Sequence, residues 1–418
     1  MIGSNRSFGY DAAATFANFI ATPSVWDAFA IHSVLPTVPL KSVASNDHVL
    51  LSLLGHLIYS TTGSRSEVVY RLIPSLAAGG TVGVTSTVLA RRFGLLAGVC
   101  AGLYIATDPL FVDNSRDLRG YSLAALCVVV ATVILAGRWT RWRLVAYALL
   151  IGLAITAHVF AAVVLVAHIA WIATRRSRDQ LLQVAPAWTA GGLIGVAANA
   201  NIQVMELLQH GYPTSLFYLT FPRDLVFFLL GAPVLVSLGL WLASAGLGLW
   251  TLRSEPWLWT SISVVAVVVA ILWLGLQPAY LYPRFFIFLV PACAYLMAAA
   301  IVRWKVLAPV VALGAVFAAV SQVPGYTNDP LALPAAATAV ERIHAAGGTA
   351  CVIHSDEQVL AAYAKDFTVI STAEDLNRCT AVVVVSWNVD LSLRELAAQE
   401  FPRATALQAD YPAVVLEK

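Results

Sequence analysis

Long apolar runs constrain this chain more than any other feature of its sequence. Hydrophobic residues make up 59% of the chain and charged residues only 11%, whereas about a quarter of the residues are charged in an ordinary soluble protein. Between Val68 and Val323 the apolar runs follow one another with short polar breaks, and several approach the ~20 residues that a helix needs to cross a bilayer. The sequence therefore predicts a polytopic α-helical membrane protein.

The longest run, from Leu144 to Thr174, determines how many times the chain crosses. As a single helix it would exceed the hydrocarbon core of ~30 Å by roughly half. Basic residues flank both of its ends, with Arg138, Arg141 and Arg143 before it and Arg175, Arg176 and Arg178 after it, and basic loops are typical of the cytoplasmic side. We therefore expect two shorter helices that turn near Thr156 and His158, which gives about ten crossings.

With that turn, every second loop is basic. The predicted cytoplasmic loops are those with Arg91 and Arg92, Arg138 to Arg143, Arg175 to Arg178, Arg253, and Arg303 with Lys305. The other loops, the N-terminal segment and the chain after Val323 then share the opposite face, together with most of the acidic residues. We expect a multi-pass protein of the plasma (inner) membrane whose N-terminal and C-terminal segments are extracytoplasmic.

Residues 1–66 are predicted to form the first extracytoplasmic loop, and residues 67–323 the transmembrane helical domain. Two apolar patches in the loop, Ala12 to Ile20 and Val49 to Tyr59, are too short to cross and are expected to lie as helices on the membrane surface. This topology places Met1 outside with no segment to carry it across. Either neighbouring helices translocate the N-terminus, or a first helix is missing from this chain. We favour the missing helix, because a first helix usually sets the orientation.

Residues 324–418 are predicted to form a small extracytoplasmic α/β domain. Charged residues return to ordinary density there, and helix-like runs alternate with the strand-like runs TACVIHS, FTVIS, TAVVVVS and PAVVLEK. No Gly-rich loop connects a strand to a helix, so we favour a folded cap that helps to shape a site in the membrane part over a catalytic domain.

The cysteines divide into two groups. Cys100, Cys127 and Cys293 lie in apolar runs and are expected to be small buried hydrophobic residues. Cys351 and Cys379 precede predicted strands on the oxidising side, and they would form a disulfide if those strands are neighbours. The sequence has no CxxC and no HExxH motif, so we expect no metal site and no cofactor. A net charge of +2 without a basic patch argues against nucleic-acid binding.

The residues suited to chemistry lie in the predicted outer loops. They are Asp11 in GYDAAATF, Asp47 and His48 in SNDHVLLSLL, and Asp113, Arg116, Asp117, Arg119 and Tyr121 in TDPLFVDNSRDLRGYSL. Charges in short loops are often only solvated. Arg119 and Tyr121, however, stand at the start of an apolar helix, where a charge near hydrocarbon is usually paired or functional. His56 and His158 are expected to be packed histidines.

These segments, taken in order, resemble a known family. The succession of SNDHVLLSLLGHLIY, VVYRLIPSLAAG, DPLFVDNSRDLRGYSLAAL and YLYPRFFIFLVP is similar to the family 39 type of glycosyltransferases with the GT-C fold. That group includes protein mannosyltransferases, aminoarabinose lipid A transferases and the bacterial RgtA/B/C/D-like proteins. The resemblance covers about Gly9 to Pro291. It implies transfer of a sugar from a polyprenyl-phosphate carrier to a cell-envelope acceptor at the outer face of the plasma membrane.

The resemblance also implies roles for single residues. Asp11 matches the acid of the first outer loop, which acts as general base in the family, although a second acid that many members carry next to it is here Ala12. Asp47 is a rival base, and His48 falls at the site. Arg119 and Tyr121 match the Arg and Tyr of the second outer loop, with Asp117 at its acidic position and Asp113 nearby. Arg284 matches a basic position near the donor phosphate. Apart from the resemblance, Arg116 could bind the same phosphate through its guanidinium group.

Simple chemistry is consistent with these roles. A carboxylate takes the proton of the attacking hydroxyl, and arginines hold the charge of the leaving lipid phosphate. Direct displacement would invert the anomeric carbon. Two other interpretations stay open. A lipid or small-solute transporter should carry ionisable residues near mid-membrane and repeated halves, and we find neither in the sequence. An inactive relative that serves as an assembly partner is compatible with Ala12.

Overall fold

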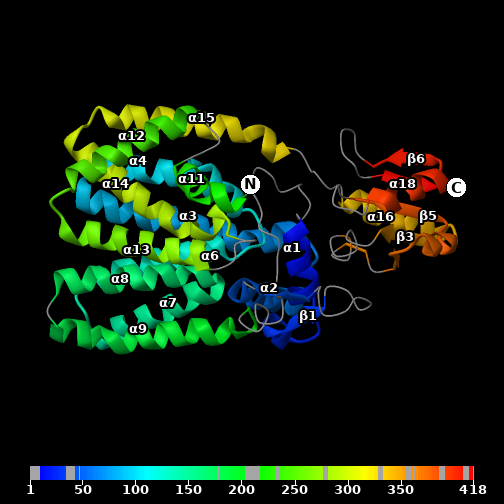
Figure 1. Ribbon diagram of the computed structural model, residues 1–418, viewed down its shortest axis with the longest axis horizontal. Coiled ribbons are helices and arrows are strands. Elements are labelled where there is room, and N and C mark those ends of the chain that lie inside the picture. The colour runs from blue at the N-terminus through cyan, green and yellow to red at the C-terminus, as the bar shows by residue number, and fades with distance from the viewer. Residues whose placement is uncertain are drawn as a thin grey trace. The chain divides into compact units, whose positions relative to one another are not determined.

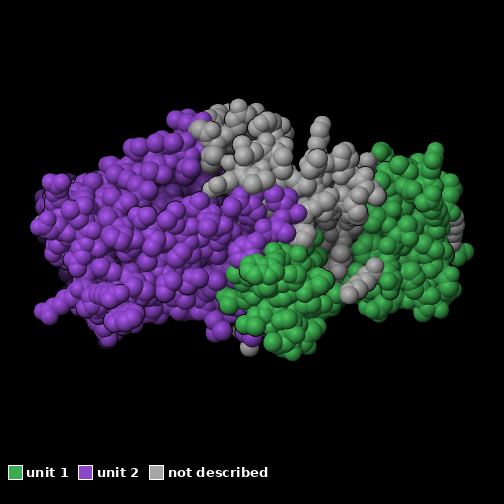
Figure 2. Space-filling view, turned by 90° about the horizontal axis from the view of Figure 1, so that it is seen from below, with its two compact units in different colours: residues 1–28, 52–70, 324–418 green, residues 29–51, 71–323 purple. Residues whose placement is uncertain are grey.

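The computed structural model describes the chain over most of its length, at residues 10–33, 43–46, 48–176, 178–202, 217–230, 235–275, 281–327, 333–353, 360, 363–364, 366–385, 391–407 and 414–417. The chain divides into two compact units (Figure 2). Unit 1 comprises residues 1–28, 52–70 and 324–418, and unit 2 comprises residues 29–51 and 71–323.

Long apolar helices make up most of unit 2 and lie side by side with similar axis directions (Figure 1). In chain order the helices of the apolar region are α3 (Glu67–Phe93), α4 (Leu95–Thr107), α5 (Pro109–Asn114), α6 (Tyr121–Ala136), α7 (Arg141–Ala157), α8 (Ala162–Arg175), α9 (Arg178–Ala198), α11 (Phe217–Leu229), α12 (Leu235–Thr251), α13 (Pro256–Gly275), α14 (Val290–Arg303) and α15 (Leu307–Thr327). Two 3₁₀ helices, η3 (Val159–Ala161) and η4 (Pro283–Leu289), precede α8 and α14.

The predicted turn in the longest apolar run is confirmed. Helix α7 ends at Ala157, and η3 separates it from α8. His158 between them has extended backbone angles (φ −161°, ψ 120°), and its Nδ1 accepts the backbone N–H of Phe160. His158 thus caps the start of η3, where backbone N–H groups lack partners within the helix.

The apolar helices make this a membrane protein. Among the described residues, four helical stretches are long and apolar enough to cross a bilayer, judged by length and composition: Glu67–Phe93, Arg178–Ala198, Pro256–Leu274 and Pro283–Arg303. Several shorter apolar helices accompany them, among them α4, α6, α12 and α15. The number of crossings and their orientation stay predictions.

Small residues let the helices of unit 2 approach closely. Helix α7 packs against α6 and α9, and α14 packs against α4 and α12. A Cβ atom at Gly195 of α9 would lie 2.3 Å from Cβ of Ile155, and one at Gly248 of α12 would lie 2.0 Å from the carbonyl oxygen of Leu296. Glycine at these contacts therefore permits the backbone approach that is common between membrane helices.

The loops predicted to be cytoplasmic meet at one end of unit 2, which we call the basic end. Nη2 of Arg175, at the end of α8, lies 2.9 Å from Oε2 of Glu255 in the α12–α13 loop, and the Arg175 guanidinium carbon lies 4.8 Å from the Trp257 ring centroid. The guanidinium of Arg176 lies 5.4 Å from the ring of Trp139, which belongs to the α6–α7 loop. These contacts join loops that are far apart in sequence.

The N-terminal segment contains both predicted short helices. α1 (Tyr10–Thr15) continues into one π-helical turn, η1 (Phe16–Ile20), and α2 covers Val49–Thr62. Within unit 1, His56 is buried as predicted and Nδ1 donates to the carbonyl oxygen of Ile20 at 3.0 Å. A 3₁₀ helix, η2 (Val25–Phe29), and the antiparallel strands β1 (Ile31–Ser33) and β2 (Val43–Ser45) were not predicted.

The C-terminal residues form the predicted α/β domain around a five-stranded sheet with the order β4-β3-β5-β7-β6. β3, β4 and β5 are parallel, whereas β7 runs antiparallel to β5 and β6. The elements are α16 (Leu333–Ala345), β3 (Ala350–Ile353), β4 (Thr368–Ile370), η5 (Ala373–Arg378), β5 (Ala381–Val384), α18 (Leu391–Glu400), β6 (Arg403–Ala406) and β7 (Val414–Glu417).

The predicted disulfide between Cys351 and Cys379 is confirmed. β3 and β5 are neighbours, and the two cysteines are bonded with their Cα atoms 5.7 Å apart. Cys100 and Cys127 are buried in unit 2, as expected, whereas Cys293 is only half-buried. The disulfide fastens the segment with β4 and η5 to the centre of the sheet.

Candidate active site

The loop between α4 and α6 is held in place by Asp108. This residue is completely buried, and its Oδ1 accepts the backbone N–H of Phe111 at 2.9 Å. It therefore caps α5, with Pro109 in the first helical position. Burial raises the pKa of Asp108 well above its ordinary value, against the lowering effect of the N–H groups of Phe111 and Leu110. No pattern in the sequence predicts this role for Asp108.

Gly120 and Tyr121, at the start of α6, lie directly against His48. A Cβ atom at Gly120 would lie 2.0 Å from the carbonyl oxygen of Ala157 and 3.2 Å from Nδ1 of His48. The ring centroids of His48 and Tyr121 are 4.9 Å apart in an edge-to-face arrangement. Only a residue without a side chain permits the approach to Ala157, so Gly120 lets the start of α6 lie against the end of α7, with His48 alongside.

His158 joins the same cluster. Its ring centroid lies 5.3 Å from that of His48, 4.9 Å from that of Tyr121 and 5.1 Å from that of Phe285 in η4. The prediction that His158 is a packed histidine is confirmed, since only 1% of it is exposed. Its packing partners, however, include two of the predicted site residues. We call His48, Tyr121, His158 and Phe285 the aromatic cluster.

Hydrogen bonds assign different proton positions to the two histidines. Nδ1 of His48 lies 3.1 Å from the carbonyl oxygen of Ala157, and a carbonyl only accepts, so this nitrogen carries a proton. Nδ1 of His158 accepts the N–H of Phe160 at 3.2 Å. Neutral His158 therefore carries its proton on Nε2. Neutral His48 carries its proton on Nδ1, so its Nε2 can accept a hydrogen bond.

The three predicted phosphate-binding arginines belong to two loops of unit 2. Arg116 is half-buried and forms an ion pair with the largely exposed Asp113. Arg119 is also half-buried, and the backbone bends sharply before it, because its N–H bonds to the carbonyl of Asp117 at 2.7 Å. The guanidinium carbon of Arg284 lies 4.8 Å from the ring centroid of Tyr282.

The two candidate bases have no described side chain. Asp47 lies outside the described residues, although Asn46 and His48 on either side are placed, with Oδ1 of Asn46 accepting the backbone N–H of His48 at 3.0 Å. The backbone of Asp11 lies in α1, and its side chain is outside the described part. Their roles as bases stay predictions. Asp117 is exposed in the second loop.

Two buried asparagines after α9 support the same region and were missed. Nδ2 of Asn199 donates to the carbonyls of Ile155 and Gly195, both at 2.9 Å. Nδ2 of Asn201 forms a long hydrogen bond of 3.5 Å with the carbonyl of Asn46. Their amide side chains give no pattern that separates them from ordinary loop residues, so the sequence offers no signal for this role.

The arginines next to the aromatic cluster make this region suited to binding a polar ligand that carries negative charge. Aromatic and imidazole rings from four segments form a packed floor, and the arginine-bearing loops leave from its edge at Tyr121 and Phe285. Among the described residues, no three histidine, cysteine, aspartate or glutamate side chains are grouped so as to hold a metal ion. The described side chains offer hydrogen bonding, ring contact and cationic charge.

Comparison with known proteins identifies the fold. No model of a known protein family matches the chain, and no curated protein sequence matches it. Two solved structures do: ArnT from Cupriavidus metallidurans in the apo state, with a TM-score of 0.64, and ArnT from Cupriavidus metallidurans bound to undecaprenyl phosphate, with a TM-score of 0.60. Each match covers 99% of this chain and 94% of the other at 13% identity. The predicted GT-C fold is confirmed by this likeness.

Proposed function

We propose that this GT-C chain is a glycosyltransferase that moves a sugar from a polyprenyl-phosphate carrier to an acceptor hydroxyl or amine at the outer face of the plasma membrane. The proposal is carried by the match of nearly the whole chain, 99%, to an ArnT structure that holds undecaprenyl phosphate. The arginine-bearing loops of unit 2 support it, because a lipid-linked sugar needs cations for its phosphate, and the buried aromatic cluster fixes the start of α6 close to Arg119.

In the proposed reaction the acceptor attacks the anomeric carbon of the sugar. Its proton passes to a carboxylate, for which Asp11 and Asp47 are the candidates, as the new glycosidic bond forms. The bond between the anomeric carbon and the phosphate oxygen breaks, and the carrier leaves as polyprenyl phosphate. A single displacement of this kind inverts the anomeric configuration. The phosphosugar bond is itself activated, so the reaction balances without a nucleotide.

The leaving phosphate gains negative charge, and arginines are the natural groups to hold it. Arg119, Arg116 and Arg284 are the proposed ligands, because a guanidinium offers paired N–H donors in a plane that fits phosphate. The ring of Tyr282 packs on Arg284, which would orient that guanidinium. Asp113, which is paired with Arg116, would compete with the phosphate for this cation and help to release the product.

The test is a transfer assay in membranes that contain the full chain, with a polyprenyl-phosphate-linked radiolabelled sugar as donor. Asp11→Asn and Asp47→Asn are assayed separately, and at least one should lower the rate by about 10²-fold or more, as expected when a general base is removed. Arg119→Gln and Arg284→Gln should lower the rate as well. If wild-type protein transfers sugar and both Asn variants keep its full rate, the base is another residue.

Two matched controls lie at the basic end. Asp179→Asn removes an exposed acid from the first turn of α9, and Arg253→Gln removes an arginine that packs on Trp250. Both should transfer sugar at the wild-type rate. Loss of activity in these controls would point to a general effect of charge on the protein.

A further inference from the structure

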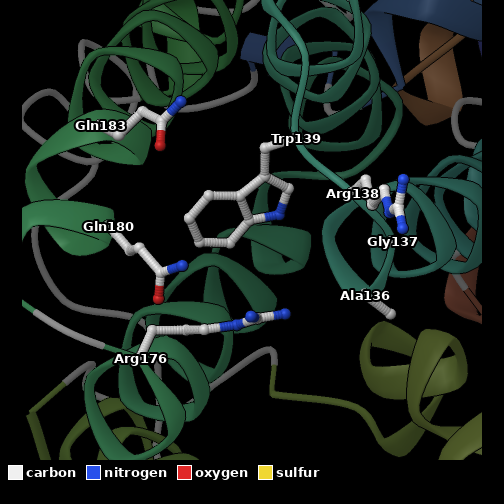
Figure 3. Close-up of a pocket in the computed structure, with 7 residues that line it drawn as sticks. All are labelled: Ala136, Gly137, Arg138, Trp139, Arg176, Gln180 and Gln183. Carbon is white, nitrogen blue, oxygen red and sulfur yellow. The ribbon is translucent and has the colours of Figure 1, made fainter.

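A polar pocket at the basic end plays no part in the proposed transfer reaction. It has a volume of about 600 Å³ and lies between the α6–α7 loop and the start of α9. Figure 3 shows the indole of Trp139 at its centre, with Gln180 and Gln183 reaching toward it from one side and Arg138 on the other. Helix α7, which begins at Arg141 and ends next to His158, separates this pocket from the aromatic cluster by its full length.

Local hydrogen bonds fix the walls of this pocket. The indole N–H of Trp139 donates to the carbonyl of Leu135 at 2.8 Å, which satisfies an end group of α6. Nη1 of Arg143 donates to the carbonyl of Arg138 at 3.0 Å and holds the loop closed. Arg176 packs over the face of the indole, with its guanidinium carbon 5.4 Å from the ring centroid. The pocket thus lies between the C-terminal end of α6 and the N-terminal end of α9.

The polar groups of the pocket select for an anion. Its lining contains the guanidinium groups of Arg138 and Arg176 and the amide groups of Gln180 and Gln183, and none of the lining residues, all within the described chain, is acidic. The nearest acid in sequence, Asp179, is exposed on the first turn of α9 and is not among them. Two guanidinium groups with amide donors match the oxygens of a phosphate.

The surroundings favour a lipid as the source of that phosphate. Arginine packs on tryptophan at four places of the basic end: Arg176 on Trp139, Arg175 on Trp257, Arg253 on Trp250 and Arg303 on Trp304. Trp142 beside the pocket is 78% exposed, as is typical of the headgroup level of a bilayer. Exposed apolar side chains also lie on the two helices that reach the pocket, among them Val133 on α6 and Leu182 on α9.

We infer that this pocket binds the headgroup of an anionic glycerophospholipid, with its phosphate between Arg138 and Arg176 and its acyl chains along α6 and α9. The inference depends on the membrane assignment and not on sugar transfer. Basic pockets between membrane helices bind such headgroups in other proteins. Free phosphate shares the headgroup chemistry but would make no use of the exposed apolar side chains.

The experiment places the full chain in nanodiscs of phosphatidylcholine with increasing phosphatidylglycerol and counts bound phosphatidylglycerol by native mass spectrometry. The double variant Arg138→Gln/Arg176→Gln should bind it about 25-fold more weakly than wild type, or about fivefold for each arginine. Gln183→Leu, which keeps the charge, should weaken binding about threefold. Glycerol phosphate in solution, at concentrations equal to the lipid, should not displace it.

The control is Arg253→Gln/Arg303→Gln, which removes the same charge at the same end outside the pocket and should bind within twofold of wild type. The inference is overturned if the pocket variants bind as wild type does, or if this control loses as much as they do. It is also overturned if phosphatidylcholine binds equally well or if glycerol phosphate displaces the lipid. Sugar transfer by Arg138→Gln/Arg176→Gln is measured alongside, and the proposed function predicts that it continues.

Discussion

Gly120 is the residue on which the geometry of the candidate site depends most closely. Its Cα faces the carbonyl of Ala157, and an added Cβ would lie 2.0 Å from that oxygen and 2.9 Å from its carbon. Both are backbone atoms, so neither can turn away as a side chain does. The start of α6 and the end of α7 must therefore separate if any side chain is added here.

We expect Gly120→Ala to lower the stability of the protein by about 1–3 kcal/mol, which is typical of overpacking, and to lower sugar transfer through the displaced Tyr121. Thermal unfolding in detergent measures the first effect. Gly83→Ala on α3, where a Cβ would meet nothing within 4 Å, is the matched control and should be neutral or slightly stabilising. A Gly120→Ala protein as stable and active as wild type would contradict the described approach of α6 and α7.

Asp108 predicts a pH dependence whose sign follows from its buried position. Because burial raises the pKa of Asp108 in the folded protein, its contribution to stability is fully present below the unfolded pKa of about 4 and is lost as the pH rises through the raised folded pKa. Asp108→Asn does not titrate and still caps α5. Its unfolding temperature should therefore fall less than that of wild type between about pH 4 and neutral pH.

Asp108→Ala separates the capping role from the charge. It removes the acceptor for the N–H of Phe111 and should be less stable than Asp108→Asn by about 1 kcal/mol. The comparison uses unfolding temperatures at several pH values in one detergent. Equal stability of the Asn and Ala variants would show that the cap is unimportant, and an unchanged pH slope in Asp108→Asn would assign the titration to another group.

At the scale of helices and strands, the elements with strong periodic or charge signals were predictable. The break at His158 followed from arginines at both ends of one overlong run, and the structure ends α7 there. β6 was missed because all four of its residues are exposed, so it carries no buried apolar pattern. β1 and β2 have three residues each, too few to display an alternation.

The candidate site was predictable only in part, because packing decides which side chains meet. His48 and Tyr121 carried signals of position near an apolar helix, and they do contact each other. His158 was expected to be packed, and nothing in the sequence states what it packs against. Asp108 looks like any acid before a proline, and its complete burial arises from α4, α5 and their neighbours together.

The C-terminal domain offers a test of one covalent element. The bond between Cys351 and Cys379 closes a loop over a sequence separation of 28. A bond that closes a loop of this length should stabilise the domain by roughly 3–4 kcal/mol, because it restricts the conformations of the unfolded chain. In the full chain, Cys351→Ser/Cys379→Ser should make this domain clearly more sensitive to limited proteolysis. Reductant should have the same effect on wild type and none on the double variant. Alkylation without reductant that finds two free thiols in native wild type would contradict the bond.

At the scale of the whole molecule, the charge pattern predicts an orientation. Thr62, at the exposed end of α2, is expected outside the cell, and Trp142, at the basic end, inside. Thr62→Cys should react with a membrane-impermeant maleimide in intact cells, whereas Trp142→Cys should react only after the membrane is opened. Labelling of Trp142→Cys in intact cells would reverse the orientation and place the aromatic cluster on the cytoplasmic side.

The most direct test of the account is the position of the carrier lipid. Cryo-electron microscopy of the full chain in nanodiscs with undecaprenyl phosphate should reveal its phosphate beside Arg116, Arg119 and Arg284, within reach of Asp11 or Asp47. Arg119→Gln and Arg284→Gln should weaken this density, and Arg138→Gln/Arg176→Gln should leave it unchanged. A phosphate held at any other place, or no bound carrier at saturating concentration, would contradict the assignment as a polyprenyl-phosphate sugar transferase.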